Sequence, residues 1–162
     1  MIQIQEKYLL EAINKLNTIS EEEAMQVSEK HTLSQEALMG YIFASVIESD
    51  NEELGEYLVY YFNLFLETCS LQGVKLNTID EAMIDTFQEE YIPALDEFME
   101  TDDEDLIAAI CNQPVLLSFI AQEIQATDEE GQLFSDEMAT QVFVMSVAMI
   151  GLINKAIIKA EA

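Results

Sequence analysis

The chain has 162 residues, of which 50% are apolar, and its 32 acidic side chains face only six lysines and no arginine, for a formal net charge of −26. This composition predicts one folded acidic domain spanning residues 1–162, because a disordered chain would combine high charge with low hydrophobicity. It argues against nucleic-acid and phosphate ligands, which are bound mainly through Arg and Lys. The N-terminus has no signal-peptide pattern and both cysteines sit in helical patterns, so we expect a cytoplasmic protein with buried thiols.

Apolar residues recur at helical spacing along the chain, and alternating strand patterns are absent. The first half predicts four helices. Their expected positions are residues 8–16, residues 20–30 with a capping box at Ser20 and Glu23, a third helix opening at Thr32 or Ser34, and a fourth from Asp50 to about Ser70. Residues 57–66 are apolar nearly all round, which places the fourth helix at the centre of the domain.

The second half predicts three or four more helices after Gly73. Their expected positions are residues 78–99 with a capping box at Thr78 and Glu81, residues 102–110 with Asp102 as the cap, residues 114–126 opening at Pro114, and residues 135–160. Pro93 should kink or divide the first of these. Residues 142–153 are apolar on nearly every side but too few to span a bilayer. We therefore expect a core helix and no membrane partner, the helix being covered by its neighbours or by a second copy in a homodimer.

These elements predict an all-α fold, a compact bundle or irregular array of seven to eight helices. One pentapeptide occurs twice, as Lys15–Ile19 and as Lys75–Ile79, each time before a helix cap. Two interpretations stay open. The copies reflect an ancestral duplication of a helix-turn-helix unit, or both turns converged on the same cap chemistry, with the isoleucine as a hydrophobic staple.

The sequence contains no catalytic motif. His31 is the only histidine, which removes most metal and acid–base arrangements, and its place at the end of the second expected helix indicates a capping or surface role. Carboxylate pairs such as Glu53/Glu56 and Glu100/Asp103 have no nearby cation that could help to hold a phosphate substrate. We therefore expect no enzyme activity, no cofactor and no metal.

The segment around Gly131, residues 126–137, resembles a degenerate calcium-binding loop of the EF-hand type. Gly131 stands at the turn position and Glu137 at the terminal bidentate position, but Ala126 occupies the place of the first carboxylate ligand. A polar loop between two helices explains the same residues. Cation binding by this loop is therefore an open alternative.

The most unusual feature is a stretch of acids without a base, with twelve acids in the 26 residues from Asp80 to Asp105. Glu81, Asp85 and Glu89 follow each other four residues apart, and like charges at that spacing cost about 0.2–0.5 kcal/mol per pair. Surface helices ordinarily relieve this repulsion with interleaved lysines. The residues predicted to bind a partner are Glu81, Asp85, Glu89, Asp96, Glu97, Glu100, Asp102 and Asp103.

Three interpretations of this acidic stretch compete: docking of a basic partner, simple solvation, and loose collection of divalent cations. We predict a non-enzymatic protein-binding module of the inhibitor, immunity or adaptor type that docks a basic protein. The alternatives are a structural homo-oligomer without a specific ligand and a carboxylate-based protein that binds divalent cations.

Overall fold

The computed structural model describes residues 2–125 and 134–158, and this part of the chain forms eight helices and no strand. The helices are α1 (Glu6–Thr18), α2 (Glu21–Ser34), α3 (Glu36–Ser49), α4 (Glu52–Gln72), α5 (Glu81–Thr101), α6 (Glu104–Cys111), α7 (Pro114–Gln125) and α8 (Asp136–Ala156). The predicted all-α fold of seven to eight helices is confirmed.

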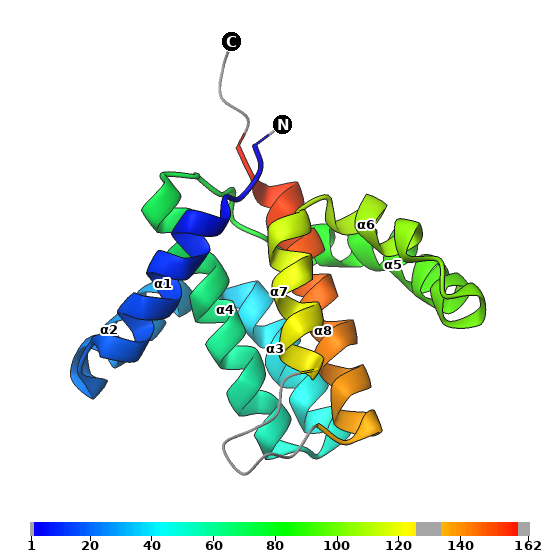
Figure 1. Ribbon diagram of the computed structural model, residues 1–162, viewed down its shortest axis with the longest axis horizontal. Coiled ribbons are helices and arrows are strands. Elements are labelled where there is room, and N and C mark those ends of the chain that lie inside the picture. Colours follow the sequence, from blue (N-terminus) through cyan, green and yellow to red (C-terminus); the bar gives the residue numbers. More distant parts are fainter. Residues whose placement is uncertain (1, 126–133, 159–162) are drawn as a thin grey trace.

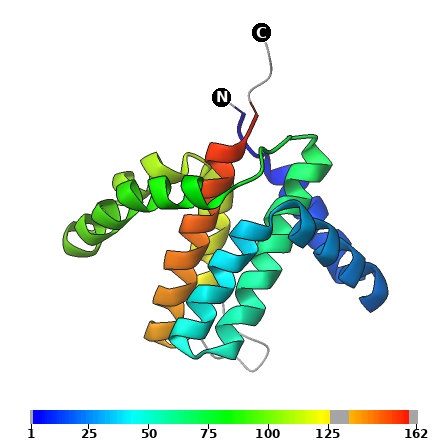
Figure 2. The same cartoon turned by 180° about the vertical axis from the view of Figure 1, so that it is seen from behind.

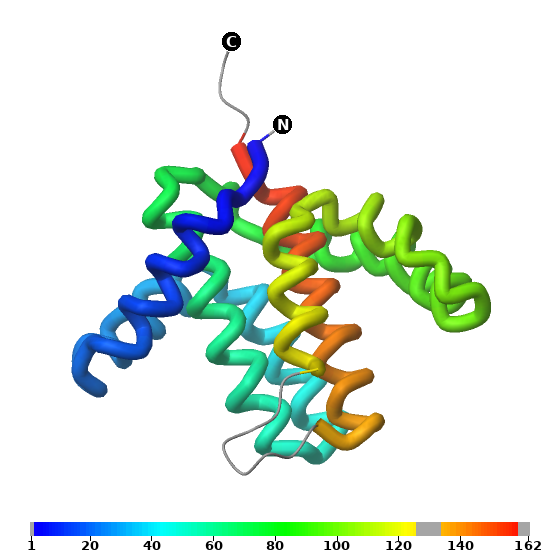
Figure 3. Tube along the Cα trace, in the orientation of Figure 1, coloured from blue at the N-terminus to red at the C-terminus, as the bar shows by residue number. Residues whose placement is uncertain are grey.

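A central body of four helices carries two helical hairpins that point away from it. Figure 1 shows α3, α4, α7 and α8 in the middle, with the α1–α2 hairpin on one side and the α5–α6 hairpin on the other. Figure 3 shows that α4 and α8 run in one direction and α7 runs in the opposite one, and in Figure 2 α3 also runs opposite to α4. The connection between α5 and α6 is therefore held far from the centre of the molecule.

The core is built around α4 and α8, which contact each other. α4 also contacts α1, α2 and α3, while α8 also contacts α3, α5, α6 and α7. More than half of the residues of each of these two helices are buried, as their all-round apolar sequences predict. Among the described residues, α8 is the one helix long and apolar enough to cross a membrane, and here it is a core helix.

The covering of α8 by five other helices also bears on the predicted homodimer. That prediction rested on an apolar helix in need of cover. Met145 and Met149 of α8 are only 7% and 1% exposed within one chain. One chain therefore covers α8 by itself, and the homodimer stays a prediction.

Several helix ends differ from the predictions. The second helix continues past residue 30 to Ser34. The cap of α4 is Asn51, whose Oδ1 accepts a hydrogen bond from the Leu54 amide, while Asp50 ends α3 in the left-handed conformation with φ 52°. α5 is capped by Asp80 instead of Thr78, because the Asp80 carboxylate accepts the Met83 amide at 2.8 Å.

α5 is one helix from Glu81 to Thr101, so Pro93 does not divide it. Pro93 is exposed, and so is Glu89, the residue whose carbonyl loses its helical hydrogen bond to a proline at this position. Water can bond that carbonyl, which removes most of the reason to break the helix. Pro114 opens α7 as predicted.

The last helix ends at Ala156 instead of near residue 160 because the chain beyond it pairs with the α4–α5 linker. Asn77 donates its amide to the Ala156 carbonyl at 2.8 Å, and Ile158 donates to the Lys75 carbonyl at 2.9 Å. Lys155 lies in the last turn of α8, where the helix dipole favours a cation. Lys159 lies outside the described residues.

The buried side chain of Gln35 also holds this linker in place through two hydrogen bonds. Its Oε1 accepts the amide of Ile79 at 2.8 Å, and its Nε2 donates to the carbonyl of Asn77 at 3.1 Å. Since Asp80 caps α5 directly after this linker, these hydrogen bonds fix where the α5–α6 hairpin leaves the body.

The repeated pentapeptide has a different structure in each copy. Lys15–Thr18 forms the last turn of α1, while residues 75–79 are a non-helical linker before α5. The element order does repeat, because a hairpin precedes an antiparallel helix pair in each half (Figure 1). However, the pentapeptide ends the first helix of one half and precedes the first helix of the other. Convergence on similar cap chemistry accounts for it better than duplication does.

Candidate functional site

The predicted partner-binding residues lie on the hairpin formed by α5 and α6, which we call the acidic arm (residues 81–111). All eight of them are exposed. Asp102 and Asp103 form the turn at the outer end of the arm, which Figure 1 shows far from the central body. The structure therefore displays the predicted surface instead of burying it.

Two of the eight acids also have a structural task. Asp102 ends α5 in the left-handed conformation, with φ 56°, so it does not cap the next helix as predicted. Asp103 is that cap, and its Oδ1 accepts the amide of Asp105 at 3.1 Å. An Asp or Asn side chain suits both positions, which explains why two of them stand side by side here.

The outer face of α5 combines charge with exposed apolar surface. Asp85, Glu89, Ile92, Asp96 and Met99 are spaced four, three, four and three residues apart, which places them on one face of the helix. Ile92 and Met99 are each 52% exposed. The charge pattern of the sequence indicated the acids of this face but not its two apolar residues.

Positive charge near this face is sparse. Lys155 of α8 pairs with Glu90 at 3.2 Å, but Glu90 is not one of the eight predicted residues. Among the described residues, no lysine forms an ion pair with any of the eight. Their mutual repulsion is therefore relieved only by solvent within this part of the chain.

At the base of the arm, a third helix adds another carboxylate. Glu36 of α3 lines a shallow hollow together with Glu81 and Asp85 of α5, and Gly40 and Tyr41 contribute to its floor. The sequence could not associate Glu36 with α5, because 45 residues separate it from Glu81 and only the packing of α3 against the arm brings them together.

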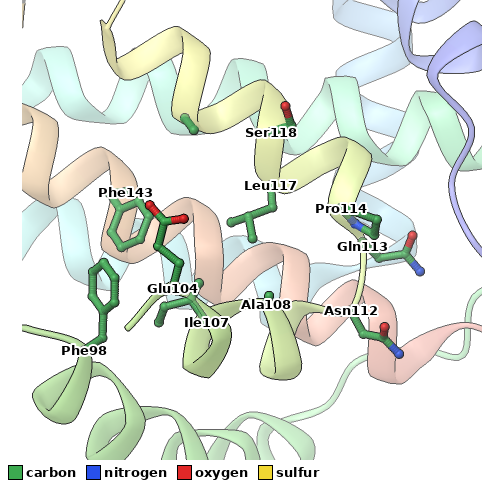
Figure 4. Close-up of a pocket in the computed structure, with 11 residues that line it drawn as sticks. Phe98, Glu104, Ile107, Ala108, Asn112, Gln113, Pro114, Leu117, Ser118 and Phe143 are labelled. Carbon is green, nitrogen blue, oxygen red and sulfur yellow. The ribbon is translucent and has the colours of Figure 1, made fainter. Parts of the chain in front are cut away.

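On its other side, the arm borders an apolar groove of about 460 Å³. Its walls come from four helices: Phe98 of α5, Ile107 of α6, Leu117 of α7 and Phe143 of α8. The rings of Phe98 and Phe143 stack with their centroids 5.6 Å apart. Figure 4 shows the Glu104 side chain extending into the space between these rings and Leu117.

His31 is buried, so the predicted capping or surface role is wrong. It is 4% exposed in the last turn of α2, and its Nε2 lies 2.7 Å from Oε2 of Glu67, a residue of α4 that is 3% exposed. The other oxygen of Glu67 accepts from the Lys15 ammonium of α1 at 2.6 Å. This buried polar cluster joins α1 and α2 to α4.

Burial shapes the pKa values in this cluster in opposite ways. Removal from water lowers the pKa of His31 below 6.5, and the hydrogen bond and charge of Glu67 only partly offset that effect. Removal from water would raise the pKa of Glu67, but hydrogen bonds from Lys15 and His31 outweigh it, so this pKa falls below 4.5. At neutral pH the cluster therefore holds a carboxylate, an ammonium and a neutral imidazole that donates to Glu67.

Cys69 and Cys111 are both free and buried, as predicted. Burial raises the pKa of each thiol to about 12, so neither is a thiolate near neutral pH. The imidazole of His31 is already engaged by Glu67. Among the described residues, the His31 side chain hydrogen-bonds Glu67 and neither cysteine, and the Cys111 thiol donates to the Val147 carbonyl instead.

No group of three His, Cys, Asp or Glu side chains close enough to hold a metal ion occurs within residues 2–125 and 134–158. The loop around Gly131 that resembles a calcium-binding loop falls largely outside the described residues. Comparison of the chain with protein families, with curated protein sequences and with solved structures finds no match.

Proposed function

We propose that this protein is a non-enzymatic protein-binding module whose acidic arm docks a basic partner. The observation that carries the proposal is the outer face of α5, where exposed carboxylates without a lysine partner alternate with half-exposed Ile92 and Met99. A merely solvated face needs no large apolar residues among its acids. A docking face uses them as contact area, while the charges provide steering and specificity.

Electrostatics give this face a kinetic advantage with a cationic partner. Carboxylates at the spacing of Glu81, Asp85 and Glu89 repel one another, and each pair costs the free protein about 0.2–0.5 kcal/mol. A basic surface would remove this repulsion and would also be attracted over a Debye length of about 10 Å at 0.1 M salt. The arm projects from the body (Figure 2), so a partner can approach it without a clash with the central helices.

The test compares two triple variants with the same change of charge. Glu81→Gln, Asp85→Asn and Glu89→Gln neutralise the arm, while Glu11→Gln, Glu29→Gln and Glu56→Gln neutralise exposed acids on α1, α2 and α4. Association with a fluorescent peptide of alternating lysine and alanine is followed by stopped flow at low and at physiological salt. We expect the arm variant to associate on the order of tenfold more slowly at low salt and the control to change little.

The same proteins separate docking from solvation. Equal association rates for the arm variant and the control variant would refute the proposal, because they would show that only net charge matters. Thermal unfolding provides the second measurement. We expect the arm variant to be more stable than the wild type by a few tenths of a kcal/mol for each repulsive pair removed.

A further inference from the structure

The groove between the acidic arm and α7–α8 has the properties of a binding pocket for an apolar side chain. Its volume of about 460 Å³ lies within the usual range of ligand pockets, about 300–1,000 Å³. Ile107, Leu117 and the stacked rings of Phe98 and Phe143 supply its apolar walls, and the four residues come from four different helices. Because all four helices pack against neighbours in the described structure, the groove is preformed.

The charge at the groove limits what can occupy it. Glu104 lines it, and Figure 4 shows this carboxylate over the apolar walls; none of the lining residues is cationic. Asp103 and Asp105 flank Glu104 in the chain at the outer end of the arm. The anionic group of a fatty acid or a nucleotide would be repelled here, whereas a cation next to an apolar group would be attracted.

A second copy of this chain is a poor occupant for the same reason. Docking the groove of one copy against another would bring acidic arms together, in molecules that each carry a formal charge of −26. Ala108 of α6 and Ser118 of α7 line the groove and are exposed, so a side chain carried on another backbone can reach it. This shape suits the helix-in-groove mode of recognition, in which a few apolar anchors provide most of the binding energy.

We propose that the groove anchors an amphipathic helix of a basic partner, with one large apolar side chain against Phe98, Leu117 and Phe143 and a Lys or Arg at Glu104. This inference rests on the proposed function and adds the anchor to it. The acidic face of α5 attracts the partner, and the groove holds it. The two surfaces lie on different sides of α5, so a substitution can affect one without the other.

The probe is a synthetic amphipathic helix of lysine and leucine, about 18 residues long so that it is helical. A lysine–alanine peptide has the same charge without the anchors, and a glutamate–leucine peptide has the anchors with the opposite charge. Binding is measured by fluorescence anisotropy, and the binding surface is mapped by backbone amide shifts in NMR spectra. We expect only the lysine–leucine peptide to shift amides of α6, α7 and the start of α8.

Two tryptophan variants on α6 test the groove directly. Ala108→Trp fills the groove from an exposed lining position, and Ala109→Trp places the same ring on an exposed neighbour that does not line it. We expect Ala108→Trp to lower the affinity for the lysine–leucine peptide about tenfold and Ala109→Trp to leave this affinity nearly unchanged. Ala121→Trp, from an exposed lining position on α7, should repeat the effect of Ala108→Trp and guards against misfolding of a single variant.

Neutralising Glu104 tests the position of the cation. Glu104→Gln should lower the affinity for the lysine–leucine peptide roughly two- to fivefold, as expected for the loss of an exposed ion pair. Asp105→Asn, which removes a neighbouring exposed charge outside the groove, should have a smaller effect. Equal effects of the two substitutions would overturn the placement of the cation at Glu104.

The outcomes separate the groove from the docking face. If leucines add no affinity, if the two α6 tryptophans act alike, or if amide shifts fall on exposed Phe43 and Ile47 of α3 instead, the groove assignment is wrong. In those cases the acidic face would still be supported if the lysine–alanine peptide associates more slowly with the variant neutralised at Glu81, Asp85 and Glu89 than with the wild type. Conversely, Ala108→Trp could lower the affinity for the lysine–leucine peptide while the arm variant leaves the association rate of the lysine–alanine peptide unchanged. That result would support the groove and refute the acidic face.

Discussion

Replacing Gly151 by alanine should destabilise the protein, because the inner side of α8 has no room for a methyl group there. A Cβ at Gly151 would lie 2.6 Å from Cε2 and 2.7 Å from Cζ of Phe87. The Phe87 ring is fully buried and stacks on Tyr91 with centroids 5.1 Å apart. Tyr91 in turn donates its hydroxyl hydrogen to the Val144 carbonyl of α8 at 2.7 Å. Because this hydrogen bond holds Tyr91 in place, the Phe87 ring stacked on it cannot simply turn away from the new methyl group.

The magnitude follows from two opposing effects. Forcing an extra methyl group into a packed core costs about 1–3 kcal/mol, and contact as close as 2.6 Å places this site at the upper end. Alanine is a better helix former than glycine in a helix interior by about 1 kcal/mol. The net expectation for Gly151→Ala is therefore a loss of about 2 kcal/mol in the free energy of unfolding.

Gly40→Ala is the matched control, because Gly40 also lies inside a helix but has open space around it. A Cβ there would meet no atom within 4 Å, so only the helix propensity remains, and we expect a gain of about 0.5–1 kcal/mol. Urea unfolding followed by circular dichroism measures both variants. The reasoning is refuted if the two substitutions change stability in the same direction. Adding Phe87→Leu to the Gly151→Ala variant should restore part of its loss, since coupled neighbours are not additive.

Two further predictions concern the buried polar cluster. Glu67→Ala should destabilise by about 2 kcal/mol because it leaves the buried imidazole of His31 without its acceptor, whereas Lys155→Ala, which removes an exposed ion pair, should cost less than about 0.5 kcal/mol. Similar losses for the two variants in urea unfolding would contradict this. The lowered pKa of His31 means that the unfolded chain takes up this proton first, so unfolding free energy should decline as the pH falls below 6.5. His31→Gln should lack this part of the decline, and identical slopes for wild type and variant between about pH 6.5 and 5 would count against the assignment.

The sequence predicted the number of helices because each helix depends on periodicity and caps within a few residues. Two of the wrong caps, Asp50 and Asp102, have a common cause. Asp50–Asn51 and Asp102–Asp103 are pairs of residues that can each cap the next helix or end the previous one in the left-handed conformation. In both pairs the first residue ends one helix and the second begins the next, and only the three-dimensional course of the chain between the helices selects this arrangement.

The candidate site was predictable in part. The eight acids of the arm were found from charge and spacing, since both are properties of one helix and the turn after it. Ile92 and Met99 were missed because a helical pattern does not state which of its apolar residues the body will cover. The groove could not be found either, because Phe98, Ile107, Leu117 and Phe143 meet only when four helices have packed.

Sequence alone was enough to predict the acidic charge, the all-α class, the central position of α4 and α8 and the acids of the arm that have no lysine partner. These properties follow from composition and from neighbours along one helix. The tertiary structure alone decided that His31 is buried on Glu67, that Glu36 joins Glu81 and Asp85, and that an apolar groove opens beside the arm. Each of these depends on side chains far apart in the sequence, whose approach is set by the packing of whole helices.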